Sequence, residues 1–343
     1  MPAKTPWSNG GRLHYCRREP EPRHTHPRRL YSTYDFGRML AHPRVSAYTS
    51  ALARAVRPGD VVVDIGTGTG YFAMVAARLG ARKVYAIEGI RQACQIARAT
   101  VRDNGLEGIV EVVHGLSTAL ELPERADVAF GDLRGRLPTF GANVASMADA
   151  RARLLKPDGR LLPLRDHVLA ALVESDDLHE HFFGGFRDPA FDLAACRRAV
   201  THEIHDDDKC PIRPEHLVTA PARLFTVEYG VPSDVFRGDI ELVASRTGVA
   251  HAIALWFDAE IDAEAGFSNA PGGKLAVYGR VVLPWDEPVP LVEGERVRMS
   301  AVVRASGDDH LFSFATTTRS RRVRQTTVAL TEITGVLPPS PRA

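Results

Sequence analysis

The chain has 343 residues, enough for two domains of ordinary size, and its 43 basic and 42 acidic residues nearly cancel. No overall field therefore favours nucleic acid or a membrane surface as a partner. The four cysteines form no C-x-x-C pair, which argues against a metal site, and there is neither a membrane-length apolar run nor a signal peptide, so we expect a cytoplasmic protein.

Hydrophobic periodicity predicts an α/β region after a loosely ordered start. Residues 1–29, rich in Pro, Arg and His, are expected to be a flexible lead-in. In residues 30–163 strands alternate with helices, which predicts a doubly wound, mostly parallel sheet. The expected helices cover residues 45–56, 71–79, 91–104 and 145–155, and the expected strands cover 61–65, 83–87, 111–114, 126–130 and 160–162.

Residues 164–335 change character and predict an all-β, barrel-like domain, followed by a Pro-rich tail at 336–343. Residues 179–214 interrupt the strand pattern and gather several phenylalanines, which predicts a docking arm or, equally, a segment packed on its own domain. The expected strands cover residues 167–174, 222–229, 238–245, 249–257, 276–283, 296–304 and 310–317, with a hairpin turn at 306–309.

The stretch from Val61 to Gly70 carries the clearest functional pattern. An apolar strand runs into Asp64, three glycines alternate with threonines, and a helix follows. Such a turn brings backbone N–H groups close to a ligand. A dinucleotide fingerprint would need glycine where Tyr71 stands, so nicotinamide binding is disfavoured. The next strand ends in Glu88, whose carboxylate can accept hydrogen bonds from both hydroxyls of a ribose.

These motifs resemble those of class I S-adenosylmethionine (SAM) methyltransferases, and the chain from 30 to 318 resembles the protein arginine methyltransferases. The resemblance rests on the glycine turn with Glu88 and on residues 31–34, 126–132, 154–159 and 266–268. It implies a Rossmann-like SAM-binding sheet, a β-barrel domain and a homodimer formed through the arm. The implied cofactor-binding residues are Tyr34, Met39, Arg44, Asp64, Gly66, Thr67, Gly68, Gly70, Glu88, Gly89, Gly115, Leu116, Ser117, Thr118 and Asp132.

Within that set, the resemblance implies individual roles. Asp64 and the glycines border the methionine part of SAM, and Ser117 and Thr118 lie near the adenine. Arg44 pairs with the SAM carboxylate, with Arg38 as the alternative because the local spacing is one residue short.

The acceptor loop departs from the family. Family members grip the substrate guanidinium with two glutamates, but Asp132 stands at the first position and Gly141 at the second. The family's Thr-His-Trp loop becomes residues 276–278, which lack its histidine. Arg134 and Arg136 also enter the loop, so an incoming guanidinium is expected to meet cations, which disfavours ordinary protein-arginine methylation.

We therefore assign acceptor roles with alternatives. Arg134 and Arg136 are predicted to bind a carboxylate or phosphate on the substrate, or else to be solvated loop charges. Tyr31 is also predicted to bind substrate. Asp132 is predicted to orient or deprotonate the nucleophile, or else to cap the following turn. Tyr34 and Tyr278 are predicted to line the methyl-transfer site, or else to serve as packing.

The sequence thus predicts a SAM-dependent methyltransferase that acts on a nitrogen or oxygen of a small-molecule or peptide acceptor. One alternative is an arginine N-methyltransferase, acting on free or protein-bound arginine, that uses Asp132 with a second acid that the sequence does not place. Glu124 or Asp127 would then need to approach the site. The other is a non-catalytic, dimeric SAM-binding scaffold.

Overall fold

The computed structural model describes residues 36–139, 142–188, 190–273, 277–306 and 309–334. The predictions made for Tyr31, Tyr34, Gly141 and Ala276, for the lead-in and for the Pro-rich tail lie outside these residues. No helix of the described ranges combines the length and the apolar character needed to cross a membrane.

The first half of the described chain is built on a five-stranded parallel sheet with the order β3-β2-β1-β4-β5. The order reverses between β1 and β4, and ligands bind beyond the carboxyl ends of the strands at such a switch point. The strands are β1 (Val61–Ile65), β2 (Lys83–Glu88), β3 (Val110–His114), β4 (Ala126–Gly131) and β5 (Leu155–Leu162). All five residues of β1 are buried, which its run of β-branched side chains predicts.

Helices flank this sheet and deliver residues to its carboxyl edge. The α-helices are α1 (Phe36–Leu40), α2 (Arg44–Ala55), α3 (Tyr71–Arg78), α4 (Arg91–Asp103) and α5 (Asn143–Asp149), and α5 continues as a π-helical turn (Ala150–Leu154). The helices α3 and α4 pack against β1, β2 and β3. A short 3₁₀ turn, η1 (Ser117–Ala119), follows β3.

The second half consists of antiparallel strands in two sheets, of order β7-β12-β10-β6-β8 with β11 beside β10, and β15-β14-β13-β9. The bridge between Thr219 and Ala244 links them. The strands are β6 (Arg165–Val173), β7 (His205–Asp206), β8 (Ala222–Glu228), β9 (Val235–Val243), β10 (Gly248–Glu260), β11 (Gly266–Ser268), β12 (Val281–Leu291), β13 (Arg296–Ser306), β14 (Asp309–Thr317) and β15 (Arg322–Thr326). The expected fold class, a Rossmann-like sheet followed by an all-β domain, is confirmed. The strand expected at 276–283 was placed too early, because β12 begins at Val281.

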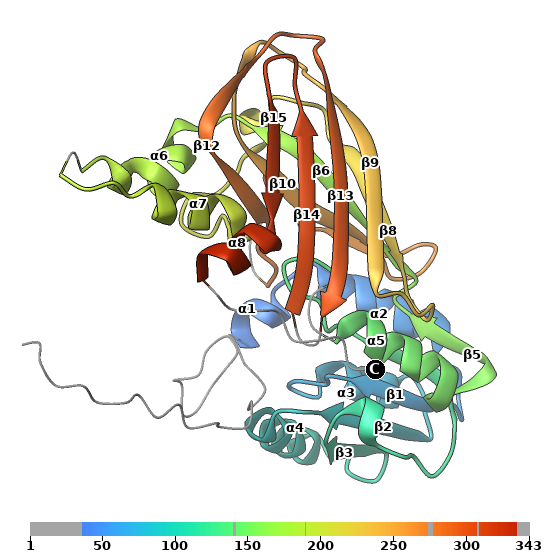
Figure 1. Ribbon diagram of the computed structural model, residues 1–343. Coiled ribbons are helices and arrows are strands. Elements are labelled where there is room, and N and C mark those ends of the chain that lie inside the picture. Colours follow the sequence, from blue (N-terminus) through green and yellow to red (C-terminus); the bar gives the residue numbers. More distant parts are fainter. Residues whose placement is uncertain (1–35, 140–141, 189, 274–276, 307–308, 335–343) are drawn as a thin grey trace, which may run out of the picture. The chain divides into compact units, whose positions relative to one another are not determined.

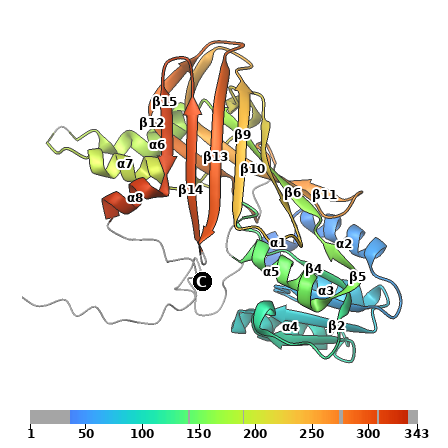
Figure 2. The ribbon, with the colours of Figure 1, turned by 45° about the vertical axis from the view of Figure 1, so that its right-hand side comes forward.

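The segment expected as an arm is helical, which its sequence had not predicted. It contains α6 (Asp176–Phe183), η3 (Gly184–Phe186), α7 (Ala194–His202) and η4 (Pro214–His216), and α8 (Thr327–Thr334) packs against α7. Both ribbon views show α6, α7 and α8 gathered on one side of the β-strands (Figures 1 and 2). Phe183 is buried, whereas Phe191 is 69% exposed.

Candidate active site

The turn after β1 depends on glycine for its backbone geometry. Gly66, Gly68 and Gly70 have φ angles of +75°, +57° and +80°, in the left-handed region that other residues rarely adopt. A Cβ atom on Gly66 would also lie 2.4 Å from Cδ2 of Leu133. The turn therefore brings bare backbone to the carboxyl edge of the sheet.

Two buried carboxylates support this turn. Asp64 accepts a hydrogen bond of 2.6 Å from the hydroxyl of Thr67. Glu88 accepts one bond from the N–H of Gly68 and another from the N–H of Ile90, both 2.9 Å long. Glu88 thus ties the end of β2 to the glycine turn.

Burial raises the pKa of Asp64 to about 7, although the hydrogen bond from Thr67 partly opposes this rise. A cationic ligand at this carboxylate would offset the cost of its burial. Asp64 is therefore suited to a ligand that carries an ammonium or sulfonium group.

A cavity lies between the glycine turn, α1 and α2. Of the residues predicted to bind the cofactor, those that line it are Met39, Arg44, Asp64, Gly66, Thr67, Gly68 and Asp132. The sequence did not assign the others to the cofactor site; they are Phe36, Leu40, Tyr48, Thr69, Tyr71, Phe72 and Phe130. Helical spacing is the one signal for Tyr48, which follows Arg44 by one turn of α2.

The remaining predicted cofactor residues lie outside the lining of that cavity. Gly70 caps α3, and a Cβ atom there would contact Ala97 of α4. Gly89 and Gly115 follow β2 and β3, beside Leu116, which is 66% exposed. Ser117 is buried and Thr118 is exposed. Apart from Gly70, these residues follow the carboxyl ends of β2 and β3 in the chain. The cofactor roles of all of them stay predictions.

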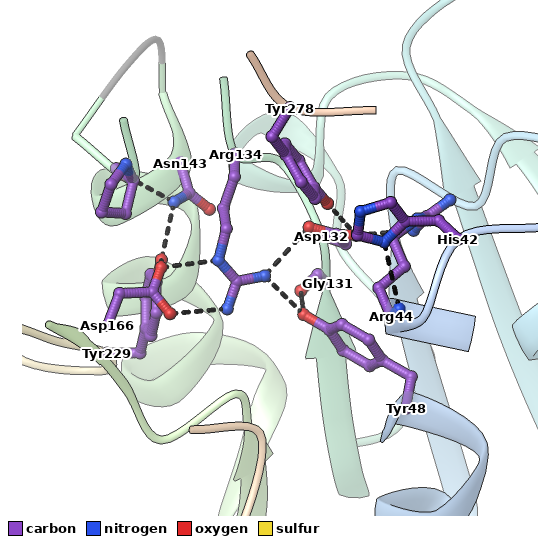
Figure 3. Close-up of polar contacts among 11 residues, drawn as sticks. His42, Arg44, Tyr48, Gly131, Asp132, Arg134, Asn143, Asp166, Tyr229 and Tyr278 are labelled. Carbon is purple, nitrogen blue, oxygen red and sulfur yellow. Dashed lines mark hydrogen bonds and ion pairs between the residues drawn. The ribbon is translucent and has the colours of Figure 1, made fainter. Parts of the chain in front are cut away.

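Asp132, directly after β4, is surrounded by donors (Figure 3). Its Oδ2 accepts a hydrogen bond of 2.5 Å from Nη1 of Arg44 and another from the hydroxyl of Tyr278. Its Oδ1 accepts a bond of 2.9 Å from Nη1 of Arg134. Burial by itself would raise the pKa of Asp132, but the two guanidinium groups and the Tyr278 hydroxyl hold that pKa below its usual value.

Arg134 is buried and is not a solvated loop charge, nor is it available to a substrate anion in this structure. Its Nε and Nη2 donate to the two carboxylate oxygens of Asp166 at 2.6 and 2.8 Å. Tyr229 donates a further bond of 2.6 Å to Asp166 and accepts one of 3.0 Å from Asn143. The sequence prediction for Arg134 is therefore corrected, because Asp166 at the start of β6 neutralises it.

Around Asp132 the packing is aromatic. Tyr48 donates to the carbonyl of Gly131 and accepts from Nη1 of Arg134, at 2.8 Å each. The Tyr278 ring stacks on Phe267, with centroids 5.7 Å apart, and meets His42 edge to face. These contacts surround the carboxylate with aromatic rings, and this low-dielectric setting strengthens its interactions with the guanidinium groups.

The structure places the other residues considered for the acceptor site in different ion pairs. Arg136 is half-buried, 3.6 Å from Asp206. Glu124 pairs with Arg82, and Asp127 accepts bonds from Lys156 and from the N–H of Val61. Asp127 lies near the amino end of β4 and Glu124 precedes that strand, whereas Asp132 follows its carboxyl end, so neither acid approaches Asp132.

Comparison with known proteins identifies the nucleotide-binding half. Residues 41–162 match the family model described as ribosomal protein L11 methyltransferase (PrmA). The chain is a SAM-dependent methyltransferase. The site fits that cofactor: Asp64 suits its cationic groups, and the buried Nε of Arg44, which has no hydrogen-bond partner among the described residues, suits its carboxylate.

Two relatives of this methyltransferase are named as arginine methyltransferases. It is 29% identical over 293 residues to an arginine N(omega)-methyltransferase of Streptomyces achromogenes subsp. streptozoticus, covering 79% of this chain and 76% of the relative. It is 27% identical over 261 residues to protein arginine N-methyltransferase 1 of Schizosaccharomyces pombe, covering 73% and 75%.

Solved structures share the fold of the methyltransferase. A chain of the Trypanosoma brucei PRMT1 enzyme–prozyme heterotetrameric complex with AdoHcy aligns with a TM-score of 0.77 at 22% identity, over 86% of this chain and 98% of that one. Arabidopsis thaliana protein arginine methyltransferase 10 aligns with a TM-score of 0.71 at 22% identity, over 86% and 97%.

Proposed function

We propose that the methyltransferase transfers the methyl group of SAM to a guanidinium nitrogen of arginine. The observation that carries this proposal is that Asp132 already binds guanidinium groups, those of Arg44 and Arg134. A carboxylate among aromatic rings favours such a planar cation, whose N–H groups donate in a fixed geometry.

The balance of buried charges supports a cationic acceptor. The positive charge of Arg134 is neutralised by Asp166. Arg134 therefore does not repel a cationic substrate, although its position in the sequence had suggested that it would. Arg44 is expected to pair with the carboxylate of bound SAM, which would release Oδ2 of Asp132. Asp132 would then carry an uncompensated negative charge, which the monocation of an arginine side chain can neutralise.

The cofactor and Asp132 have separate parts in the proposed methyl transfer. The bound cofactor supplies an electrophilic methyl group, and an acceptor nitrogen forms the new N–C bond as the S–C bond breaks. Oδ2 of Asp132 accepts an N–H of the guanidinium and holds the attacking nitrogen in line. Because the pKa of Asp132 is lowered, its part is to orient the acceptor; the proton leaves after transfer, through Asp132 to solvent.

A methyl-acceptor panel with labelled SAM tests this proposal. It would contain arginine and arginine-rich peptides on one side, and carboxylate-bearing amines and alcohols on the other. We expect label in the guanidinium compounds, and loss of that label in Asp132→Asn with cofactor affinity retained. Label confined to the amines or alcohols would overturn the arginine assignment. It would support instead the broader prediction from the sequence, a nitrogen or oxygen acceptor other than arginine.

We also propose a homodimer formed through the arm of α6 and α7. The support is the exposure of Phe191 beside α7, where an apolar ring faces solvent in the single chain. Sedimentation velocity would reveal a dimer that Phe191→Asp dissociates. A monomer at micromolar concentration would contradict it.

A further inference from the structure

Three charged side chains meet beside Gly279, the residue after Tyr278. A Cβ atom placed on Gly279 would lie 3.5 Å from Cβ of Asp206, 3.5 Å from Oδ1 of Asp208 and 3.9 Å from Cγ of Arg136. These residues come from the loop after β4 and from the end of the arm, so only the fold brings them together. We call Arg136, Asp206 and Asp208 the Gly279 cluster.

The groups of this cluster are incompletely paired. The closest ion-pair contact of Arg136, to Asp206, is 3.6 Å long, and its bond to the carbonyl of Ile204 is 3.5 Å. Asp207, by contrast, is fully buried and bonded to Arg280, with an Nε–Oδ2 distance of 2.7 Å. Asp206 and Asp208, which flank it in sequence, lie beside Gly279.

The electrostatics of the cluster agree with this geometry. Desolvation raises the pKa of Asp208, as do the like charges of Asp206 and Asp207, and Arg136 and Arg38 oppose that rise. A carboxylate in this situation gains from an added ammonium group. The cluster thus offers one guanidinium and two carboxylates, which complement the carboxylate and ammonium of an α-amino acid.

Tyr278 sets the distance between this cluster and Asp132. The hydroxyl of Tyr278 donates a hydrogen bond to Asp132. The backbone of Tyr278, at the other end of the side chain, is adjacent to Gly279. A tyrosine from Cα to its hydroxyl and an arginine from Cα to its guanidinium have nearly the same length. An arginine lying along Tyr278 with its guanidinium on Asp132 would therefore bring its Cα to the Gly279 cluster.

We propose that the Gly279 cluster binds the α-carboxylate and α-ammonium of free arginine, so that the acceptor is the amino acid and not an arginine within a polypeptide. Arg136 binds the carboxylate, and Asp206 with Asp208 binds the ammonium. This proposal rests on the proposed arginine methylation and adds the substrate class.

Agmatine, which is arginine without its carboxylate, tests the proposal directly. The wild-type protein should methylate arginine with a kcat/KM roughly tenfold or more above that for agmatine, the size expected from one charged hydrogen-bonding contact. In Arg136→Gln, kcat/KM for arginine should fall to about the kcat/KM for agmatine, and kcat/KM for agmatine should stay unchanged. Asp208→Asn should in turn remove the preference for arginine over its α-N-acetyl derivative.

The control is Arg321→Gln, at a half-exposed arginine that pairs with Glu287, and it should leave kcat/KM for both substrates unchanged. Equal rates for arginine, agmatine and an internal arginine of a peptide, unchanged by Arg136→Gln, would overturn the cluster while leaving arginine methylation intact. Methylation of none of these compounds would instead refute the proposed function. Loss of activity towards arginine and agmatine alike in Arg136→Gln would assign Arg136 a structural part and overturn the proposal.

Discussion

Asp166 binds Arg134 through two hydrogen bonds, Nε–Oδ2 at 2.6 Å and Nη2–Oδ1 at 2.8 Å, with both side chains almost fully buried. This pair converts a cation in the acceptor loop into a neutral support for Asp132. The third nitrogen of the guanidinium, Nη1, still donates to Oδ1 of Asp132, so the pair also fixes the orientation of that carboxylate.

Breaking this pair on one side should unfold the site. Arg134→Met leaves Asp166 buried and uncompensated, and we expect a loss of about 3–5 kcal/mol in the free energy of unfolding. The double variant Arg134→Met/Asp166→Leu removes both charges and should recover most of that stability. Urea denaturation of the three proteins measures this, and equal stability of the single and double variants would contradict the pairing.

Asp132 should remain ionised throughout the working range of pH. Its pKa is lowered from the usual 3.8, so protonation of Asp132 should not reduce kcat until the pH falls below that value. We expect kcat at saturating SAM to stay level between about pH 5 and 8 as far as Asp132 is concerned. In Asp132→Asn, kcat should fall by about a hundredfold or more, the scale of a lost electrostatic contact in a transition state.

That variant also separates binding from chemistry. S-adenosylhomocysteine affinity, measured by calorimetry, should change little in Asp132→Asn. A large loss of affinity with unchanged kcat would mean that Asp132 serves the cofactor and not the acceptor.

Asp64 should make folding stability fall as the pH rises. Its folded pKa of about 7 exceeds its ordinary 3.8, so the folded protein binds more protons than the unfolded chain between these values. The contribution of Asp64 is fully present below pH 3.8 and is lost as the pH rises through 7. The change is of order 4 kcal/mol in the free energy of unfolding.

Asp64→Asn should remove this dependence. The free energy of unfolding, from urea titrations of the cofactor-free protein at pH 4.5 to 7.5, compares wild type with Asp64→Asn. Parallel pH profiles for the two proteins would show that Asp64 does not carry the raised pKa.

Glu88 should affect the cofactor through both of its contacts. In the structure it accepts the N–H groups of Gly68 and Ile90, and the resemblance assigns it the ribose hydroxyls. We expect Glu88→Ala to weaken S-adenosylhomocysteine binding by roughly tenfold or more, since two charged hydrogen bonds are lost. Glu111→Gln, on the exposed end of β3, is the matched control and should bind normally.

Local patterns in the sequence were sufficient for the nucleotide-binding half. The run from Val61 to Gly70 predicts a buried strand and a left-handed glycine turn because each residue type has few backbone alternatives. Glu88 at the end of the next strand is equally local, because adjacent parallel strands end at the same edge. The helices α6 and α7 were missed, since the phenylalanines gathered in this segment do not indicate secondary structure and α7 contains none of them.

The acceptor half was decided by tertiary structure. In sequence, Arg134 and Arg136 are equivalent loop cations, yet one is buried on Asp166 and the other lies beside Gly279. Asp166 stands in an apolar strand 32 positions further along the chain, and nothing local indicates its partner. The sequence alone thus determined the cofactor turn, because backbone sterics act between neighbours. Only the fold decided which charges cancel, because electrostatic energy depends on distance in space and on burial.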